Sequence, residues 1–418
     1  MKYDVVIAGA GPAGISAALE AARSGLKTAL IERYGCVGGN LTLGYVGPLL
    51  GAVCPGTIAE EIEEAICEKR GAFPDFERAK IALTYLLDEA GVDVYLQTSV
   101  IGSERIGENI KTLYTSGKFG NISFSAEVFI DATGDGDLAM LSGCKFEMGR
   151  DGDGLVQPVT LMFLIDGVDP DQPLLCRHEE DYTDLGDGRE YLDLCRNACH
   201  TGELPENVNI VRLYATATKT ERMVNATQEN RINPLDPSDV FRAEASLRRQ
   251  IGKIVDFLKN NIPGFENIRI KGSASTLGVR ESRRIIGRYQ LTEQDLMQGR
   301  TYPDSVVHKA NFRLDIHNPS GAGQAVHEER RPAKPKPYDI PFAAMCPIGC
   351  NNLITAGRCI SGTHVAHSSY RVMRICMAMG QAAAAAASVM LKTDTNTSTV
   401  DVEEIRKHLI CRGVHLED

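Results

Sequence analysis

The sequence predicts an α/β protein with a Rossmann-like nucleotide-binding domain and an inserted mixed α+β domain. The Rossmann-like part is expected to hold a parallel sheet with helices, plus a small antiparallel sheet. Three observations predict this fold. A glycine-rich turn follows the first apolar run, helical and strand-like segments follow it along the first 145 residues, and another apolar run ending in glycine returns at 352–361. Strands that alternate with helical segments are typical of parallel α/β sheets.

The first 32 residues have the pattern of a strand, a turn, a helix and a second strand. Val5–Ile7 is a β-branched run, and Gly9, Gly11 and Gly14 follow it at G-x-G-x-x-G spacing. In such a turn the first glycine permits the tight bend, the second lets a pyrophosphate approach the backbone, and the third lets the helix pack on the strand. Glu32 ends the second strand, where a carboxylate can accept ribose hydroxyls. The segment predicts a dinucleotide site, and this acid disfavours a 2′-phosphate.

Later segments extend this pattern. The loop 32–40 (ERYGCVGGN) adds a glycine pair whose backbone amides can wrap the far side of a pyrophosphate. Segment 129–139 (FIDATGDGDLA) reads as a strand followed by an acidic turn, and 352–361 (NLITAGRCIS) as a strand that breaks at Ala-Gly-Arg. Hydrophobic periodicity predicts helices at 57–71 and 75–91, and strands at 92–100, 109–116 and 121–131.

With these motifs the sequence resembles the FAD-dependent oxidoreductases of the glutathione-reductase-like superfamily. The resemblance covers most of the chain and is strongest at GAGPAG, ERYGxxGG, IDATGDGDLA, LGVRESRRIIGRYQLTEQDL, YDIP, NLITAGRCIS and RVMRICMAMGQAAAAAA. It implies a noncovalent FAD across the N-terminal domain, with its ring at the border of the inserted domain. The expected cofactor-binding residues are Gly9, Gly11, Pro12, Ala13, Gly14, Glu32, Arg33, Gly38, Gly39, Asn40, Gly134, Asp135, Gly357, Arg358, Arg371 and Val372.

The organisation of the chain follows from changes in its character. From about residue 150 a strand at 156–169 looks like part of a different sheet, and helices are predicted at 188–201 and 241–262. The proline-rich segment 330–341 (RRPAKPKPYDIP) reads as a linker. The predicted units are an FAD-binding domain at 1–145, an inserted substrate domain at 146–334, the second part of the FAD-binding domain at 335–395, and a peripheral segment at 396–418.

The segment 277–290 (LGVRESRRIIGRYQ) offers a candidate catalytic arginine. Arg280 directly follows a strand-to-glycine break, where a guanidinium can hold a substrate carboxylate or polarise a carbonyl. Its neighbour Glu281 could instead neutralise it. The arginines that follow, Arg283 and Arg284 among them, are expected to form a salt-bridged helix face.

Two segments offer candidate proton-transfer histidines. Residues 311–321 alternate like a strand, and His317 lies two residues from Asp315, which could orient and charge it. A structural hydrogen bond is the alternative. Residues 363–373 (THVAHSSYRVM) contain His364 and His367, but no carboxylate or third histidine is near enough in sequence for a metal, and a serine nucleophile would need a G-x-S-x-G elbow that the chain lacks.

We interpret 363–373 as the start of a helix with Ser368 or Ser369 as its N-cap. The positive end of that helix would point at the pyrimidine edge of the flavin, where it would stabilise the negative charge of the reduced ring. His364 or His367 would then border the substrate, the alternative being that both bond only to the backbone.

Composition excludes other classes. A net charge of −10 argues against a nucleic-acid or membrane partner. No run of about 18 apolar residues occurs, so a membrane span is not expected. The twelve cysteines are expected to be free thiols in the cytoplasm. The C-x3-C pairs Cys195/Cys199 and Cys346/Cys350 lack further ligands, so no metal is expected.

The predicted function is that of an FAD-dependent oxidoreductase that transfers a hydride between a small oxygen-bearing organic substrate and flavin N5. His317 or His364 would move the accompanying proton, and Arg280 would orient the substrate. Two alternatives stay open at this stage, namely an electron-transfer flavoprotein that acts with a protein partner, and a non-redox FAD enzyme. A homo-oligomer or a redox partner protein is compatible with the sequence.

Overall fold

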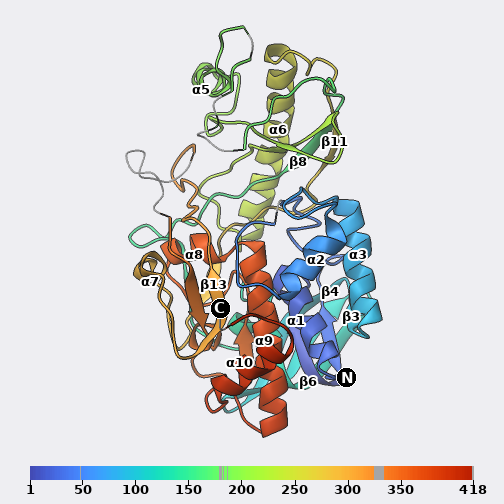
Figure 1. Ribbon diagram of the computed structural model, residues 1–418, viewed down its shortest axis with the longest axis vertical. Coiled ribbons are helices and arrows are strands. Elements are labelled where there is room, and N and C mark those ends of the chain that lie inside the picture. The colour runs from blue at the N-terminus through green and yellow to red at the C-terminus, as the bar shows by residue number, and fades with distance from the viewer. Residues whose placement is uncertain (48, 178–180, 182, 186, 324–333, 417–418) are drawn as a thin grey trace.

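The computed structural model describes residues 1–47, 49–177, 181, 183–185, 187–323 and 334–416. Part of the predicted linker, residues 330–333, lies outside this range. The chain forms two units, one around a large mixed sheet and the other around an antiparallel sheet beside the long helix α6 (Figure 1). The predicted α/β class, with a Rossmann-like sheet and a second mixed unit, is confirmed.

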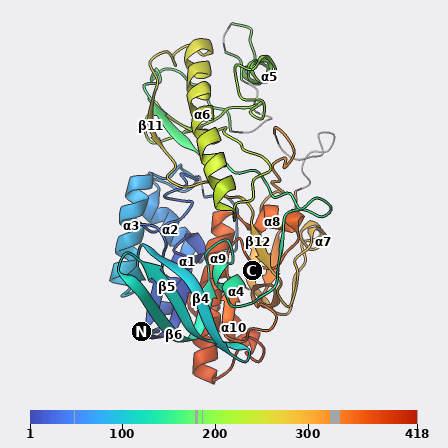
Figure 2. The same ribbon diagram turned by 180° about the vertical axis from the view of Figure 1, so that it is seen from behind.

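The large sheet has the strand order β3-β2-β1-β6-β5-β4, and β15 also pairs with β6. Its first four strands and β15 run parallel, whereas β4, β5 and β6 pair antiparallel. The long strand β6 belongs to both parts, and the antiparallel part is seen best from behind (Figure 2). The strands are β1 (Lys2–Ala8), β2 (Thr28–Ile31), β3 (Asp93–Tyr95), β4 (Thr98–Ile106), β5 (Asn109–Gly117), β6 (Gly120–Asp131) and β15 (Leu353–Thr355).

Two helices from opposite ends of the chain pack tightly on this sheet (Figure 1). They are α1 (Pro12–Arg23) and α9 (Met373–Thr393). At Gly380 of α9, an added Cβ would lie 1.9 Å from the Ala13 carbonyl oxygen, so only glycine allows this approach. The small residues of α9 therefore pack directly against α1. Although α9 is long and apolar enough to cross a membrane, 89% of its apolar window is buried as core.

Further helices cover the same unit. The helices α2 (Ile58–Ile66) and α3 (Phe76–Glu89) correspond to the two predicted at 57–71 and 75–91. The short α4 (Asp137–Leu141) follows the acidic turn after β6, and α10 (Val402–Cys411) packs on α9 near the C-terminal end.

The second unit has an antiparallel sheet with the order β11-β8-β10-β9. Helix α6 begins at Pro237, four residues before the predicted start, because Asp236 caps it by accepting hydrogen bonds from the amides of Ser238 and Asp239. The elements are β8 (Phe163–Asp166), β9 (Arg212–Ala215), β10 (Glu221–Asn225), β11 (Arg269–Ser273), α5 (Tyr191–Thr201) and α6 (Pro237–Asn261). A separate hydrophobic cluster within residues 159–277 forms its core.

Residues after this cluster return to the first unit. Leu291, Leu296 and Val306 belong to the core that also holds α1 and α9. We therefore propose that the insertion ends well before the predicted limit at 334. The elements of this part are β7 (Phe146–Met148), which pairs with β12 (Arg283–Ile285), α7 (Glu293–Gln298), β13 (Ser305–Ala310), which pairs with β14 (Tyr338–Pro341), and the 3-10 turn η1 (Phe342–Met345).

Three local predictions are wrong. Arg283 and Arg284 lie on strand β12 rather than on a helix, because this segment pairs with β7. Residues 312–321 form no strand, since Asn311 and His317 make no more than isolated bridges. The segment from 363 forms a short helix of its own, α8 (His364–Tyr370), before α9 begins.

The cap of α8 is Thr363, whose hydroxyl accepts from the amide of Ala366 at 3.2 Å. The predicted caps Ser368 and Ser369 instead lie inside α8. Their hydroxyls donate to the carbonyl oxygens of Val365 and Phe312, both at 2.7 Å. Both serine hydroxyls act as donors to carbonyl oxygens, so neither caps the amides at a helix N-terminus.

Candidate active site

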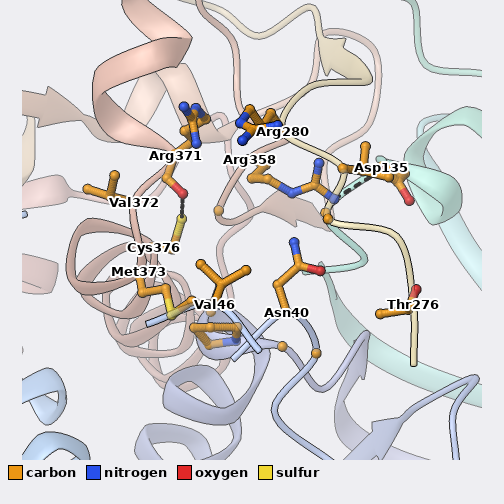
Figure 3. A pocket seen from close by; sticks show the side chains of 18 of the residues that line it. Asn40, Val46, Asp135, Thr276, Arg280, Arg358, Arg371, Val372, Met373 and Cys376 are labelled. Atoms are coloured by element: carbon orange, nitrogen blue, oxygen red, sulfur yellow. Dashed lines mark hydrogen bonds and ion pairs between the residues drawn. The ribbon is translucent and has the colours of Figure 1, made fainter. Parts of the chain in front are cut away.

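A cavity of about 1260 Å³ lies where the two units meet (Figure 3). It exceeds the roughly 300–1,000 Å³ of typical ligand pockets, so it has room for a dinucleotide together with a small molecule. Of the sixteen predicted cofactor-binding residues, all except Gly14 and Gly38 line it. The candidate catalytic residues Arg280 and His317 line it as well.

The turn after β1 gives each glycine a distinct role. Gly9 has a φ of +93°, and a Cβ there would lie 2.5 Å from the Ala132 carbonyl oxygen. Gly14 lets helix α1 pack closely against the turn, because an added Cβ at this position would lie 1.8 Å from the carbonyl oxygen of Gly9. Gly11 differs, because a Cβ there would meet nothing within 4 Å. Gly11 is also the N-cap of α1 and no side chain caps that helix, so the N-terminal amides of α1 are left for an anion.

Glu32 is fixed at the end of β2 beside this turn. Its two carboxylate oxygens accept hydrogen bonds from the amides of Ala10 at 2.7 Å and Tyr34 at 2.9 Å. The residue is 4% exposed and lines the cavity. A carboxylate has lone pairs beyond these two bonds, so Glu32 keeps acceptor capacity for the hydroxyls of a ribose.

Asp135 and Arg358 form the next part of the wall. Arg358 donates to Asp135 at 3.0 Å, Arg33 lies 3.5 Å from the same carboxylate, and the hydroxyl of Ser282 donates to it at 2.6 Å. Burial alone would raise the pKa of Asp135, but Arg358 and Arg33 outweigh it and lower that pKa. Gly134 allows this contact, since its Cβ would lie 2.6 Å from Arg358 Nη2.

The residues at the end of the cavity formed by the glycine turn, Glu32 and Arg358 fit an FAD. The N-terminus of α1 offers amides for a pyrophosphate, Glu32 offers acceptors for a ribose, and Arg358 Nη1 is buried with no partner among the described residues. A buried donor without a partner is costly, and a bound cofactor that supplies an acceptor would remove that cost.

The opposite end of the cavity is built around Asp315. Arg371 Nη2 lies 2.9 Å from its carboxylate, His317 Nε2 lies 3.5 Å away, and Arg313 lies 3.6 Å away. Arg313, Asp315 and His317, which alternate along the chain, therefore come together although no strand forms. Arg280 donates to the carbonyl oxygen of Pro158 at 2.7 Å, and its guanidinium lies beside that of Arg371 (Figure 3).

Burial sets the protonation of this end. It lowers the pKa of Arg280 to about 9, with a further lowering from Arg371. It also lowers the pKa of His317 to about 3, and the nearby positive charge of Arg280 acts in the same direction against the attraction of Asp315. His317 is therefore a neutral imidazole at neutral pH.

His364 is not among the residues that line the cavity. Its Nδ1 lies 2.8 Å from Glu281, which is fully buried and also pairs with Arg284. The alternative in which Glu281 neutralises Arg280 is thus wrong. His367 is 1% exposed, neither of its ring nitrogens has a partner in the described part of the chain, and burial holds its pKa well below the usual range.

Sequence reasoning missed the contribution of the second unit. Arg177, Arg212 and Tyr214 line the cavity. Arg212 and Tyr214 lie on β9, and Arg177 follows Cys176, which bridges to this strand at Leu213. Nothing in their local sequence marks these residues, because they reach the cavity only through the packing of the two units.

Among the cysteines, Cys376 lines the cavity, where its thiol donates to the carbonyl oxygen of Arg371 at 3.2 Å. All twelve fall within the described residues, and none forms a disulfide there. Cys195 and Cys199 lie on α5, whereas Cys346 and Cys350 belong to different hydrophobic clusters. Over the described ranges, no three or more His, Cys, Asp or Glu side chains are grouped to hold a metal ion.

The family of the chain follows from comparison with known proteins. The model of the family described as FAD dependent oxidoreductase matches residues 4–409. The chain belongs to this family. It is therefore an enzyme of the oxidoreductase kind, and its cofactor is FAD.

Curated relatives match this FAD-dependent oxidoreductase over short segments. The chain is 33% identical to the hydrogen cyanide synthase subunit HcnB of Pseudomonas protegens over 104 residues. This aligned segment covers 25% of this chain and 19% of that protein. The chain is 29% identical over 143 residues to the leghemoglobin reductase of Glycine max, which is 34% of this chain and 26% of that protein. The chain thus spans only about a fifth to a quarter of these relatives.

Solved structures share the fold of this oxidoreductase. A geranylgeranyl bacteriochlorophyll reductase-like protein from Thermoplasma acidophilum aligns with a TM-score of 0.52 and 14% identity, over 99% of this chain and 84% of that chain. The myxobacterial chondrochloren halogenase CndH aligns with a TM-score of 0.51 and 13% identity, over 97% and 79%. At these identities the likeness concerns the fold alone.

Proposed function

We propose that this enzyme transfers a hydride between a small oxygen-bearing organic substrate and N5 of its flavin. The observation that carries the proposal is the presence of Arg280 and His317 in the same cavity as the FAD-binding turn. When bound there, FAD supplies a two-electron acceptor or donor. The side chains of this chain would hold the substrate, exclude water and move the proton that accompanies the hydride.

Arg280 positions the substrate oxygen. Its guanidinium carries five N–H donors, and one of them, on Nη1, is engaged with the carbonyl oxygen of Pro158. Donors that remain on the cavity side suit a carboxylate or a carbonyl oxygen, which a guanidinium can bind with two parallel hydrogen bonds. Its partial burial strengthens these bonds because the local dielectric is low.

His317, rather than His364, moves the proton. Its lining position and its neutral imidazole support a role as acceptor, and Asp315 at 3.5 Å can stabilise the imidazolium that forms. His364 is directed to Glu281 instead. We propose for it a structural role, as a partner of the buried Glu281–Arg284 pair.

The N-terminus of α9 favours the reduced cofactor. Val372 is the N-cap of this helix of 21 residues and lines the cavity together with Met373. The partial positive charge of a helix N-terminus stabilises a neighbouring anion. Val372 and Met373 would therefore lie against the part of the flavin that gains negative charge on reduction.

Anaerobic mixing of the holoenzyme with hydroxy, keto and enoyl compounds tests the proposal. A substrate is expected to bleach the visible absorbance of the oxidised flavin, and His317→Gln is expected to slow this step by roughly 10²–10⁴-fold with FAD retained. His364→Gln is the matched control and is expected to stay within a few-fold of wild type. Unchanged reduction in both variants would contradict the role of His317.

The same assay separates the alternatives. Bleaching that requires a partner protein would identify an electron-transfer component, and turnover without bleaching would identify a non-redox FAD enzyme. A cytoplasmic location and a homo-oligomer or redox partner remain predictions.

A further inference from the structure

Arg280 presents one free edge of its guanidinium to the cavity. Its Nη1 donates to the carbonyl oxygen of Pro158 at 2.7 Å, whereas Nε and Nη2 have no partner among the described residues. The N–H groups of Nε and Nη2 lie on the same edge of the guanidinium and point in the same direction. Such an edge matches the two oxygens of one carboxylate, which it binds with two parallel hydrogen bonds.

The charge of Arg280 also lacks a counter-charge of its own. In the described part of the chain its guanidinium makes no ion pair, and Asp315, which attracts it, already pairs with Arg371 at 2.9 Å and with Arg313 at 3.6 Å. Burial and the neighbouring Arg371 lower the pKa of Arg280 to about 9, so the side chain still carries its charge at neutral pH. An anion that enters the cavity beside Arg280 would stabilise this charge.

The proton acceptor lies a short distance from this edge. Arg371 Nη2 and His317 Nε2 contact the same oxygen of Asp315, Oδ2, at 2.9 and 3.5 Å. Arg280 lies beside Arg371 (Figure 3), and its positive charge acts on His317. Because Nε2 of His317 faces Asp315, Nδ1 is the nitrogen left for a substrate. A small carboxylic acid held on Arg280 therefore places the carbon next to its carboxylate, rather than a more distant carbon, at the imidazole.

We propose that the substrate is a 2-hydroxy monocarboxylate, whose carboxylate is bound by Nε and Nη2 of Arg280 and whose hydroxyl donates to Nδ1 of His317. This inference rests on the proposed function and names its substrate class. In the oxidation the hydroxyl proton passes to His317, and the hydrogen on C2 leaves with its electron pair to the FAD. The bond between C2 and its oxygen then becomes a carbonyl, and the product is a 2-oxo acid. Arg371, which the sequence assigned to the cofactor, adds positive charge beside the substrate carboxylate instead.

Anaerobic mixing of the oxidised holoenzyme with positional isomers tests this inference. Both enantiomers of lactate and of 2-hydroxybutyrate are compared with 3-hydroxypropionate, 3-hydroxybutyrate and the neutral lactamide, through the rate of flavin bleaching. At least one 2-hydroxy acid is expected to bleach the flavin at least about 30-fold faster than its 3-hydroxy isomer and than lactamide. Equal rates would overturn the inference. So would the absence of bleaching by every 2-hydroxy acid, together with no reoxidation of the reduced holoenzyme by pyruvate or 2-oxobutyrate.

Variants of Arg280 test the carboxylate site with the unreactive anion propionate, whose binding is read from the visible flavin spectrum. Arg280→Gln is expected to weaken propionate binding by at least about 30-fold, with FAD content and thermal unfolding measured beside the affinity. Arg280→Lys keeps the charge but loses the edge with two donors, so it is expected to recover only part of the affinity. Arg196→Gln changes an exposed arginine outside the cavity, paired with Asp193 at 3.1 Å, and is expected to bind propionate normally. Wild-type affinity in either Arg280 variant would overturn the assignment.

The two proposals fail differently. If propionate and lactate bind through Arg280 but no compound bleaches the flavin, hydride transfer is contradicted and the substrate class falls with it, whereas the carboxylate site is supported. If a neutral alcohol or a 3-hydroxy acid bleaches the flavin and no 2-hydroxy acid does, hydride transfer is supported and the inference of a 2-hydroxy monocarboxylate is overturned.

Discussion

Arg371 and Asp315 join the two segments that form the substrate end of the cavity. Arg371 Nη2 lies 2.9 Å from both the carboxylate and the backbone carbonyl oxygen of Asp315. Arg371 ends α8, and Asp315 lies in the irregular segment after β13. The pair therefore holds in place a segment that has no strand to fix it, and His317 with it.

Asp315→Asn is expected to lower the free energy of unfolding of the holoenzyme by about 3 kcal/mol at pH 7, because it leaves buried cations without their counter-charge. Burial alone would raise the pKa of Asp315, but His317, Arg371 and Arg313 outweigh it and hold that pKa well below its usual range. Urea unfolding measures the difference.

The difference in unfolding free energy between wild type and Asp315→Asn is expected to become smaller at acidic pH. Because the folded state lowers the pKa of Asp315, its charge stabilises the fold above the unfolded pKa of about 3.9 and loses this effect as pH falls towards the folded value. The gap between wild type and Asp315→Asn should thus narrow below about pH 4. Asp193→Asn, at an exposed ion pair, should change stability little. Equal stability of Asp315→Asn and wild type at pH 7 would contradict a stabilising pair.

Gly11→Ala and Gly14→Ala are expected to fail in different ways. A Cβ at Gly11 meets nothing within 4 Å, so the apoprotein should keep its stability, but the methyl group would occupy the space that a pyrophosphate needs and weaken FAD binding by at least about tenfold. A Cβ at Gly14 would lie 1.8 Å from the Gly9 oxygen, so the protein itself should be destabilised. Apoprotein melting and FAD titration separate the two, and normal FAD affinity in Gly11→Ala would place the pyrophosphate elsewhere.

Glu32→Gln is expected to weaken FAD binding by roughly 10–100-fold. The carboxylate accepts from the amides of Ala10 and Tyr34, and an amide side chain could accept only one of these bonds while losing its charge. Fluorescence titration of the apoprotein with FAD measures the affinity. Glu61→Gln, which changes an exposed partner of Arg23, is the control and should bind FAD normally. An unchanged affinity in Glu32→Gln would show that this carboxylate does not contact the cofactor.

The sequence predicted the cofactor end of the site better than the substrate end, for physical reasons. Gly9 and Glu32 act through local backbone geometry, and local geometry leaves a pattern in the sequence. Arg212 reaches the cavity only because the second unit packs over it, so its own segment carries no signal. The start of the helix at 363 was misplaced because Thr363 and Ser368 are both good N-caps by type. In the structure Thr363 caps the helix, and Ser369 inside it donates to the Phe312 carbonyl oxygen, a tertiary contact that the local sequence does not encode.

Stability at mildly acidic pH tests the environment of His317. Burial, with Arg280 and Arg212 nearby, lowers its pKa to about 3 against the attraction of Asp315. In the unfolded chain the pKa of a histidine is about 6.5. Between these values the unfolded state binds a proton that the folded state does not, so the free energy of unfolding falls as pH decreases.

For His317 this effect amounts to about 2 kcal/mol between pH 7 and pH 5. His317→Gln should therefore lose about that much less stability than wild type over the same interval, when unfolding by urea is followed at both values. His200→Gln removes an exposed histidine on α5 and should keep the wild-type dependence. If His317→Gln also kept the wild-type pH dependence of the unfolding free energy, His317 would have to be protonated in the folded enzyme at pH 5. Its pKa would then lie close to that of an unperturbed histidine, and the burial beside Arg280 would not be what sets its protonation.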